Sequence, residues 1–258
     1  MKLFFLLFIT LSTVGSAAIS TSVLADDVIK VSVGMYPYAP FVENKGNGIE
    51  GMTIDLIAAL NQLQKKYRFE AILIPPKRRY QSYLDGHYDV IFYENKAWGW
   101  HDIDIAASKV YQYGGEVYVA LKQPGRGQEY FDDFNGKRMM GVLGFHYGFA
   151  NFNADEGYLT HHFQMQLSHD NNKNLTKLHK GRGDIVVVTK AYLERYLLDN
   201  PEVREKLLIS DKLDQEYHHS VLVRPGLVPS VAEINTMLEA LEASGALTRL
   251  FLKYGIEP

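Results

Sequence analysis

Apolar residues in the first third of the chain follow two periods that predict alternating strands and helices. Met52, Leu56, Leu60 and Leu63 recur every three to four positions, which places them on one face of a helix. Short runs rich in β-branched residues, such as IKVSV, are typical of strands. This alternation favours a parallel sheet with helices on its faces. The predicted strands are 29–33, 69–74 and 89–93, and the predicted helices are 52–67 and 78–84.

The same pattern restarts in the second half of the chain. Each half contains a Gly-x-x-Asp step into an apolar strand, at 86–89 and again at 181–184. Ser230 followed by Glu233 is the signature of a capping box and predicts the start of the last helix. The predicted strands are 117–121, 137–143, 184–189 and 219–224, and the predicted helices are 175–180, 191–198 and one beginning at Ser230.

The N-terminal segment has the order of regions found in a secretory signal peptide. Lys2 supplies a positive charge, residues 3–9 are continuously apolar, and small residues lead to Ala25. The apolar run is too short for a stable membrane span, so we expect cleavage after Ala25 and a periplasmic protein that begins at Asp26. A membrane anchor or a buried strand are the alternative interpretations.

Composition excludes several classes of protein. The chain has no cysteine, so it carries neither a lipoprotein anchor nor disulfides. Its net charge is −3 and no basic stripe is present, which argues against nucleic-acid binding. No P-loop, HExxH or nucleophile elbow occurs, and we expect no cofactor and no catalytic residue. The histidine pairs at 161–162 and 218–219 lack the further ligands that a metal site needs.

Five motifs, in order, resemble those of family 3 extracellular solute-binding proteins. YAPF at 38–41, followed by GIEGMTIDL at 48–56, resembles that family's YPPF and GFDVDL opening. LFLKYG at 250–255 resembles the family's C-terminal helix end. The other similar segments are YLDGHYDVI at 83–91, FNGKR at 134–138 and LHKGRGD at 178–184.

The resemblance implies an α/β fold of the two-lobed periplasmic binding protein type (type II). Lobe 1 would comprise 26–116 plus 223–258, and lobe 2 would comprise 117–222. Two crossing strands would join the lobes, with a ligand cleft between them. The physical argument agrees, because ligands of open α/β sheets lie beyond the carboxyl ends of the strands. We therefore expect a monomer that closes around a small polar ligand.

Candidate ligand-binding residues come from the loops that follow the predicted strands. Aromatic rings near a carboxylate can hold a cation or the face of a sugar. The competing interpretation of each aromatic residue is core packing, and that of Arg79 is an exposed basic run with its neighbours. The loop after Gly144 either offers free N–H groups to an anion or is a simple turn. The candidates are Tyr36, Tyr38, Arg79, Tyr93, Glu94, Trp98, Phe145, His146 and Thr189.

The two charged residues with which amino-acid-binding members of this family hold their ligand are missing. Members that bind amino acids hold the α-carboxylate with an arginine after the third strand and the amino group with an aspartate after the later strand of lobe 2. Those positions fall at about His101 and at Thr189, and no arginine occurs between Arg79 and Arg126. A neutral imidazole cannot replace a guanidinium fork. We expect a ligand other than a standard α-amino acid.

Three functions remain open from the sequence. The first is a receptor that delivers solute to an inner-membrane ABC permease. The second is a ligand sensor that docks on a signalling receptor. The third is an enzyme on the same scaffold, similar to cyclohexadienyl dehydratase, for which Glu94 or His146 could act as acid or base.

Overall fold

The computed structural model describes residues 27–46 and 48–257. The predicted signal peptide and the predicted first residue, Asp26, lie outside this range. Within it, no helix is both long enough and apolar enough to cross a membrane.

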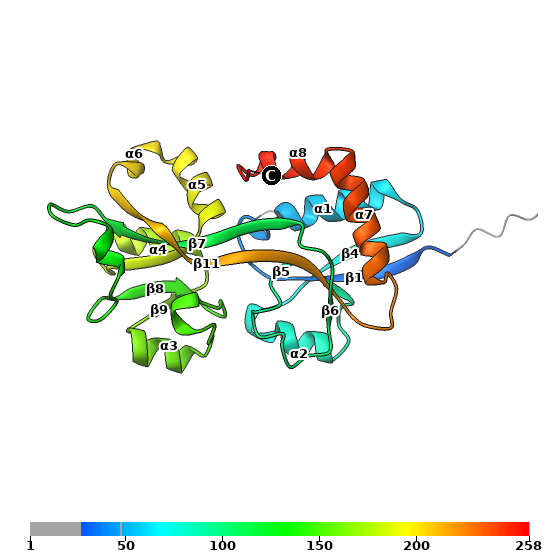
Figure 1. Cartoon of the computed structure of the whole chain (residues 1–258), viewed down its shortest axis with the longest axis horizontal. Coiled ribbons are helices and arrows are strands. Elements are labelled where there is room, and N and C mark those ends of the chain that lie inside the picture. The colour runs from blue at the N-terminus through cyan, green and yellow to red at the C-terminus, as the bar shows by residue number, and fades with distance from the viewer. Residues whose placement is uncertain (1–26, 47, 258) are drawn as a thin grey trace, which may run out of the picture.

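The molecule has two halves, and the one that holds both the N-terminal strands and the C-terminal helices is called the first half. It is built on three parallel strands. β1 (Ile29–Met35) lies between β4 (Tyr67–Leu73) and β5 (Val90–Glu94). Figure 1 shows α1 (Met52–Leu63), α7 (Val231–Ala243) and α8 (Ala246–Lys253) above this sheet and α2 (Arg79–Leu84) below it. The predicted strands and helices of this half are confirmed, with ends shifted by a few residues.

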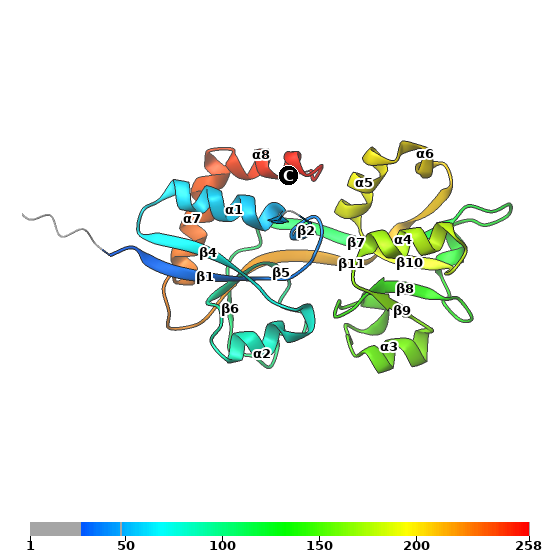
Figure 2. The same cartoon turned by 180° about the vertical axis from the view of Figure 1, so that it is seen from behind.

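The second half has its own sheet, in the order β7 (Gln112–Leu121), β10 (Ile185–Thr189), β8 (Met139–Val142) and β9 (Gln166–Ser168). Side chains of β10 alternate between its two faces, as a fully buried strand requires. One face packs against α3 (Glu156–Phe163), and the other packs against α4 (Asn171–His179) and α5 (Lys190–Asp199). Figure 2 shows the same arrangement from behind.

Two long antiparallel strands connect the halves. β11 (Leu207–Val223) pairs with β7 from Leu207 opposite Leu121 to His219 opposite Gln112, and its last residues then pair with β5. The sequence predicted only the ends of this ribbon, 117–121 and 219–224. The two strands run through the middle of the molecule (Figure 1). The lobe boundaries near Glu116 and Leu222 stay a prediction.

The repeated Gly-x-x-Asp step has the same structural role in both halves. Asp89 Oδ2 accepts a 2.8 Å hydrogen bond from the backbone N–H of Ser32. Asp184 Oδ2 accepts one of the same length from the N–H of Arg138. Each aspartate thus ties the start of its own strand to the neighbouring strand, to the middle of β1 for Asp89 and to the residue before β8 for Asp184. The predicted capping box at Ser230 is also present.

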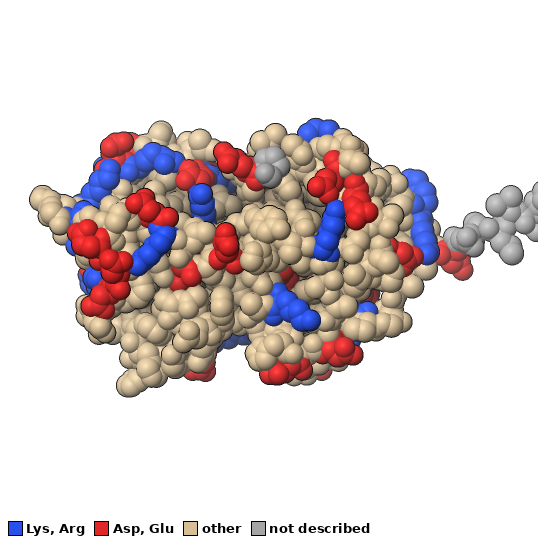
Figure 3. Space-filling view, viewed as in Figure 1, with Lys and Arg blue, Asp and Glu red and all other residues tan. Residues whose placement is uncertain are grey.

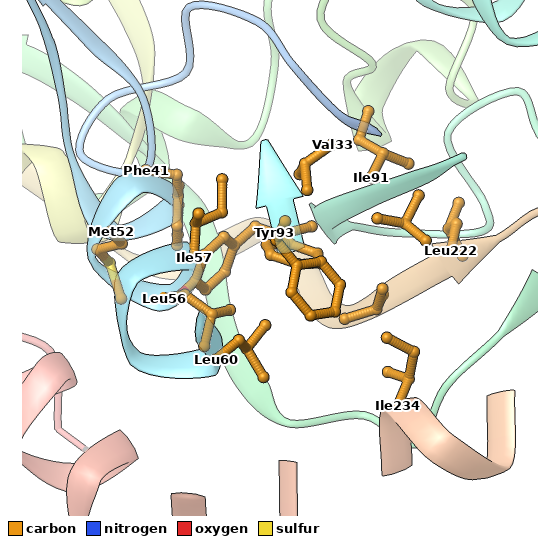
Figure 4. Close-up of a cluster of buried hydrophobic side chains, with 14 of the residues drawn as sticks. Val33, Phe41, Met52, Leu56, Ile57, Leu60, Ile91, Tyr93, Leu222 and Ile234 are labelled. Carbon is orange, nitrogen blue, oxygen red and sulfur yellow. The ribbon is translucent and has the colours of Figure 1, made fainter. Parts of the chain in front are cut away.

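The core of the first half lies between its sheet and helices α1 and α7 (Figure 4). Phe41, Met52, Leu56 and Leu60 pack there against strand residues that include Ile91.

The remaining short strands and α-helix are β2 (Glu43–Lys45), β3 (Gly48–Glu50), β6 (Ala106–Ala107) and α6 (Pro201–Arg204). Figure 3 shows acidic and basic side chains interspersed over one face, without a basic stripe on it.

Candidate functional site

A cavity of about 10 Å³ lies where the two halves meet the ribbon of β7 and β11. This volume holds about one water molecule, so the surrounding side chains are closely packed. The first half, the ribbon and the second half all contribute to its wall. The lining residues are Tyr36, Tyr38, Arg79, Trp98, Glu116, Gly144, Phe145, His146, Gln215 and Tyr217.

Arg79, the first residue of α2, spans the cavity from the first half to the second. Its side chain is 2% exposed, and its Nε lies 3.3 Å from Glu94 Oε1. Its Nη1 donates to the carbonyl oxygens of Pro76 at 3.0 Å and Gly144 at 3.1 Å. Gly144 belongs to the loop after β8, so one guanidinium joins the two halves.

Glu94, at the end of β5, fixes the position of Arg79 from behind. Its carboxylate accepts hydrogen bonds from the Tyr36 hydroxyl at 3.0 Å and from Trp100 Nε1 at 2.9 Å. Burial raises the pKa of Glu94, and the positive charge of Arg79 opposes that shift. Glu94 does not line the cavity itself, but it holds two residues that do.

Tyr38 is the centre of an aromatic cluster at the cavity. Its ring lies edge-on to Trp98, with 5.9 Å between centroids, and edge-on to Phe145 at 5.4 Å. Trp98 in turn is perpendicular to Tyr217, at 5.0 Å. Phe145 comes from the loop after β8, so its contact with Tyr38 crosses between the two halves.

A polar row runs across three neighbouring strands beside these rings. Glu116 of β7 is the register partner of Thr189 on β10 and of Gln215 on β11. Residues paired in this way point to the same face of the sheet, with Cβ atoms about 5 Å apart. Gln215 Nε2 donates a 2.9 Å hydrogen bond to Glu116 Oε2. The Thr189 hydroxyl is buried and has no hydrogen-bond partner within the described chain.

Glu116 differs from Glu94 because no cation among the described residues neutralises it. Burial raises the pKa of Glu116 to about 8, with a further contribution from the nearby Asp214 carboxylate. Hydrogen bonds from Gln215 and Tyr217 offset only part of that shift. The carboxyl is therefore mostly protonated at neutral pH.

His146 is a neutral acceptor in this site. Burial, assisted by the charge of Arg79, lowers the pKa of His146 to about 3. Arg79 Nη2 lies 3.1 Å from His146 Nδ1 and can only donate, so Nδ1 accepts. The proton of the neutral ring is then on Nε2, which faces the Tyr80 hydroxyl at 3.2 Å. Gln215 Nε2 also donates to the His146 carbonyl.

The N–H groups at the start of the helical turn 148–150 are occupied within the protein and are not free for an anion. The backbone N–H groups of Gly148 and Phe149 both donate to the Asp214 carboxylate, at 2.7 and 2.8 Å. Asp214 also accepts from the Tyr118 hydroxyl. Of the two interpretations of this loop, the structural turn is the one observed.

The structure brings six of the nine candidate residues to the cavity wall, and Glu94 lies directly behind it. Tyr93 is placed elsewhere: its ring packs in the core against Phe41 and Tyr111 (Figure 4). Thr189 is buried beside Glu116 but is not part of the wall. The six are Tyr36, Tyr38, Arg79, Trp98, Phe145 and His146.

Three wall residues were missed because they lie within the ribbon strands. They are Glu116, Gln215 and Tyr217. The alternation of buried Gln215, Tyr217 and His219 with exposed Glu216 and His218 is the signal that could have revealed this face.

His101, the expected position of the amino-acid arginine, has a side chain that is 73% exposed and pairs with Asp102. Within the described residues, no cluster suited to a metal ion is present.

Two surface grooves lead to the cavity from different directions. One, of about 500 Å³, shares Tyr38 and Phe145 with the cavity wall. The other, of about 380 Å³, shares Arg79, Gly144 and His146. Each group of shared residues comes from both halves of the molecule. Separation of the halves would therefore open the cavity from both sides.

The chain belongs to the bacterial extracellular solute-binding proteins, family 3, whose sequence profile matches residues 29–257. The predicted family is thus confirmed, and the two-lobed type II fold is confirmed with it. No curated protein matches the chain in sequence.

Solved structures show the same fold at low sequence identity. A mutant of ArgBP from T. maritima is 21% identical with a TM-score of 0.66, over 87% of this chain and 94% of that one. A substrate-binding protein of an ABC uptake transporter from Streptococcus pneumoniae, with bound histidine, is 18% identical with a TM-score of 0.67, over 87% and 92%. An ancestral amino acid-binding protein, a precursor of cyclohexadienyl dehydratase, is 16% identical with a TM-score of 0.65, over 87% and 94%.

The Arg79–Glu94 pair predicts strong energetic coupling between two substitutions. Arg79→Met leaves the Glu94 carboxylate buried without a cation and should lower the free energy of unfolding by about 3–5 kcal/mol. The double variant Arg79→Met/Glu94→Gln removes both charges and should recover much of that loss. Urea unfolding of the wild type, the two single variants and the double variant measures the coupling. Additive losses would show that the two side chains do not stabilise each other.

Glu116 predicts a specific dependence of stability on pH. Its pKa is about 8 in the folded protein, against a usual value of 4.5. Its contribution is therefore complete below pH 4.5 and is lost as the pH rises through 8. Between pH 5 and 8 the wild type should lose about 4 kcal/mol relative to Glu116→Gln, at about 1.4 kcal/mol per pH unit. Urea unfolding across this range measures the difference. As a control, Glu216→Gln removes an exposed carboxylate from β11 and should show the same pH dependence of stability as the wild type. If the stability of Glu116→Gln instead varies with pH in parallel with that of the wild type, the raised pKa of Glu116 is contradicted.

Proposed function

We propose that the protein is a periplasmic solute-binding protein that captures a small polar ligand by closing its two lobes and delivers it to an inner-membrane ABC importer. The observation that carries this proposal is the bridge from Arg79 in the first half to the Gly144 carbonyl in the second. Since opening breaks this bond, a ligand that contacts side chains of both halves can compensate for its loss and favour closure. The similar fold of an ABC uptake protein supports the importer.

The ligand we propose is not a standard α-amino acid. Arg79 is the one arginine buried among the described residues, and Glu94 already neutralises its charge. His101 is on the surface, and Thr189 cannot neutralise an ammonium group as an aspartate would. An α-carboxylate in this cleft would lack a free guanidinium fork and would lie near Glu116.

An enzyme is the second candidate, because one cavity contains both a protonated carboxyl and a neutral imidazole. Glu116 could donate a proton, and His146 could accept one if the cleft opens and its Nδ1 is released from Arg79. Gln215 hydrogen-bonds to both Glu116 and His146. The similarity in fold to a dehydratase precursor agrees with this alternative. Turnover of prephenate or arogenate would favour the enzyme. A ligand sensor would use the same cleft and differ in its membrane partner.

Calorimetric titration tests the proposed specificity. Protein stripped of ligand by unfolding and refolding should bind none of the twenty amino acids more tightly than about 1 mM, which corresponds to about 4 kcal/mol of binding free energy. Mass spectrometry of material released by denaturation should identify a different small polar molecule. A low-micromolar dissociation constant for any amino acid would refute the exclusion.

A further inference from the structure

The cleft contains two buried glutamates, and only one of them has a cationic partner. Glu94 lies 3.3 Å from the Arg79 guanidinium. Glu116 is 2% exposed, and the charged group that acts on it is another carboxylate, Asp214. Asp214 is satisfied by N–H and hydroxyl donors but is not neutralised by a cation. If both glutamates and Asp214 are ionised, this region has more negative than positive charge, because His146 is neutral.

The surroundings of Glu116 offer acceptors and ring faces. Thr189, its partner on β10, has a buried hydroxyl that lies close to the Tyr217 hydroxyl but makes no hydrogen bond of normal geometry among the described residues. Tyr38, Trp98 and Tyr217 line the same cavity and are roughly perpendicular to one another. Rings arranged in this way around a carboxylate stabilise a cation through their quadrupoles.

We propose, on the basis of the proposed function, that the cleft selects small organic cations without a carboxylate, whose N–H groups bind Glu116 and Thr189 between the aromatic rings. A protonated amine or guanidinium neutralises Glu116 and gives the Thr189 oxygen a donor. A carboxylate on the same molecule adds a second negative charge beside Glu116 and Asp214, which costs affinity.

Binding needs partial opening of the cleft. The closed cavity of about 10 Å³ is too small for an organic cation. Phe145 is the ring contributed by the second half, and its edge contact with Tyr38 separates the cavity from the larger groove. A ligand enters when Phe145 moves away from Tyr38, and the cation then lies between rings that contact each other in the closed form.

Proton release distinguishes this role of Glu116 from a merely structural one. The groups that face Glu116 or line the same cavity are Asp214, His146, the tyrosines at 38, 118, 147 and 217, and Arg79, whose charge is paired with Glu94. Burial raises the pKa of each of these tyrosines, and the pKa of His146 is about 3, so neither the tyrosines nor His146 change charge between pH 6 and 8. Burial also raises the pKa of Asp214, so the loss of proton release in Glu116→Gln is the result that assigns the proton to Glu116. A cation that binds at pH 6.5 should therefore displace about one proton from Glu116. Its affinity should rise about tenfold per pH unit up to pH 8.

Matched pairs of an amino acid and its decarboxylated amine provide the test. Ligand-stripped protein is titrated calorimetrically with arginine and agmatine, lysine and cadaverine, and histidine and histamine, in two buffers of different ionisation enthalpy. At least one amine should bind at least 100-fold more tightly than its parent amino acid and release about one proton. Glu116→Gln should weaken that amine at least tenfold and abolish the proton release. Thr189→Val should weaken it less, and Glu216→Gln should have no effect.

The outcomes separate this inference from the proposed function. A parent amino acid that binds as tightly as its amine, or no binding by any of the three amines, overturns the inference. The proposed function survives that result if the protein closes around a co-purifying molecule that is neutral or anionic. It fails as well if no small molecule is bound and the lobes do not close.

Discussion

The buried ion pair between Arg79 and Glu94 is the interaction on which the rest of the site depends. Glu94 ends a strand of the first half and is held by Tyr36 and Trp100. Arg79 then reaches across to Gly144 in the second half. Removing two charges from water costs several kcal/mol, and the pair persists because each group also has further hydrogen-bond partners. The closed arrangement of both walls of the cleft follows from this one pair.

The ion pair also determines which buried carboxyl of the described residues has no cationic partner. Since Arg79 is committed to Glu94, it cannot neutralise Glu116 on the neighbouring ribbon. The family fold supplies two lobes, a connecting ribbon and loops at the strand ends. The side chains of this chain then give that common cleft an unpaired carboxyl among aromatic rings. In the account proposed here, the chemistry of the ligand is a property of these side chains and not of the scaffold itself.

Local sequence patterns predicted the parts of the structure that local forces determine. The strand and helix alternation and the capping box at Ser230 depend on neighbours within a few residues. Strand-end loops correctly indicated most of the cavity wall, because parallel strands end at one edge. The length of β11 could not be predicted, since its first part is stabilised by pairing with β7, roughly a hundred residues earlier. Tyr93 follows the same strand-end pattern but lies in the core against Phe41 and Tyr111, and its φ of 54° departs from the extended backbone that the pattern assumes.

The most direct test of the account is the distance between the lobes with and without ligand. The chain has no cysteine, so spin labels can be placed at Leu84→Cys on α2 and His161→Cys on α3, two exposed positions in opposite halves. Pulsed dipolar spectroscopy should give a longer, broader distance distribution for the ligand-stripped protein. The co-purifying molecule should shift it to a single shorter distance, and Arg79→Met should reduce that shift. An unchanged distribution at saturating ligand, with binding verified by calorimetry, would contradict closure as the mechanism.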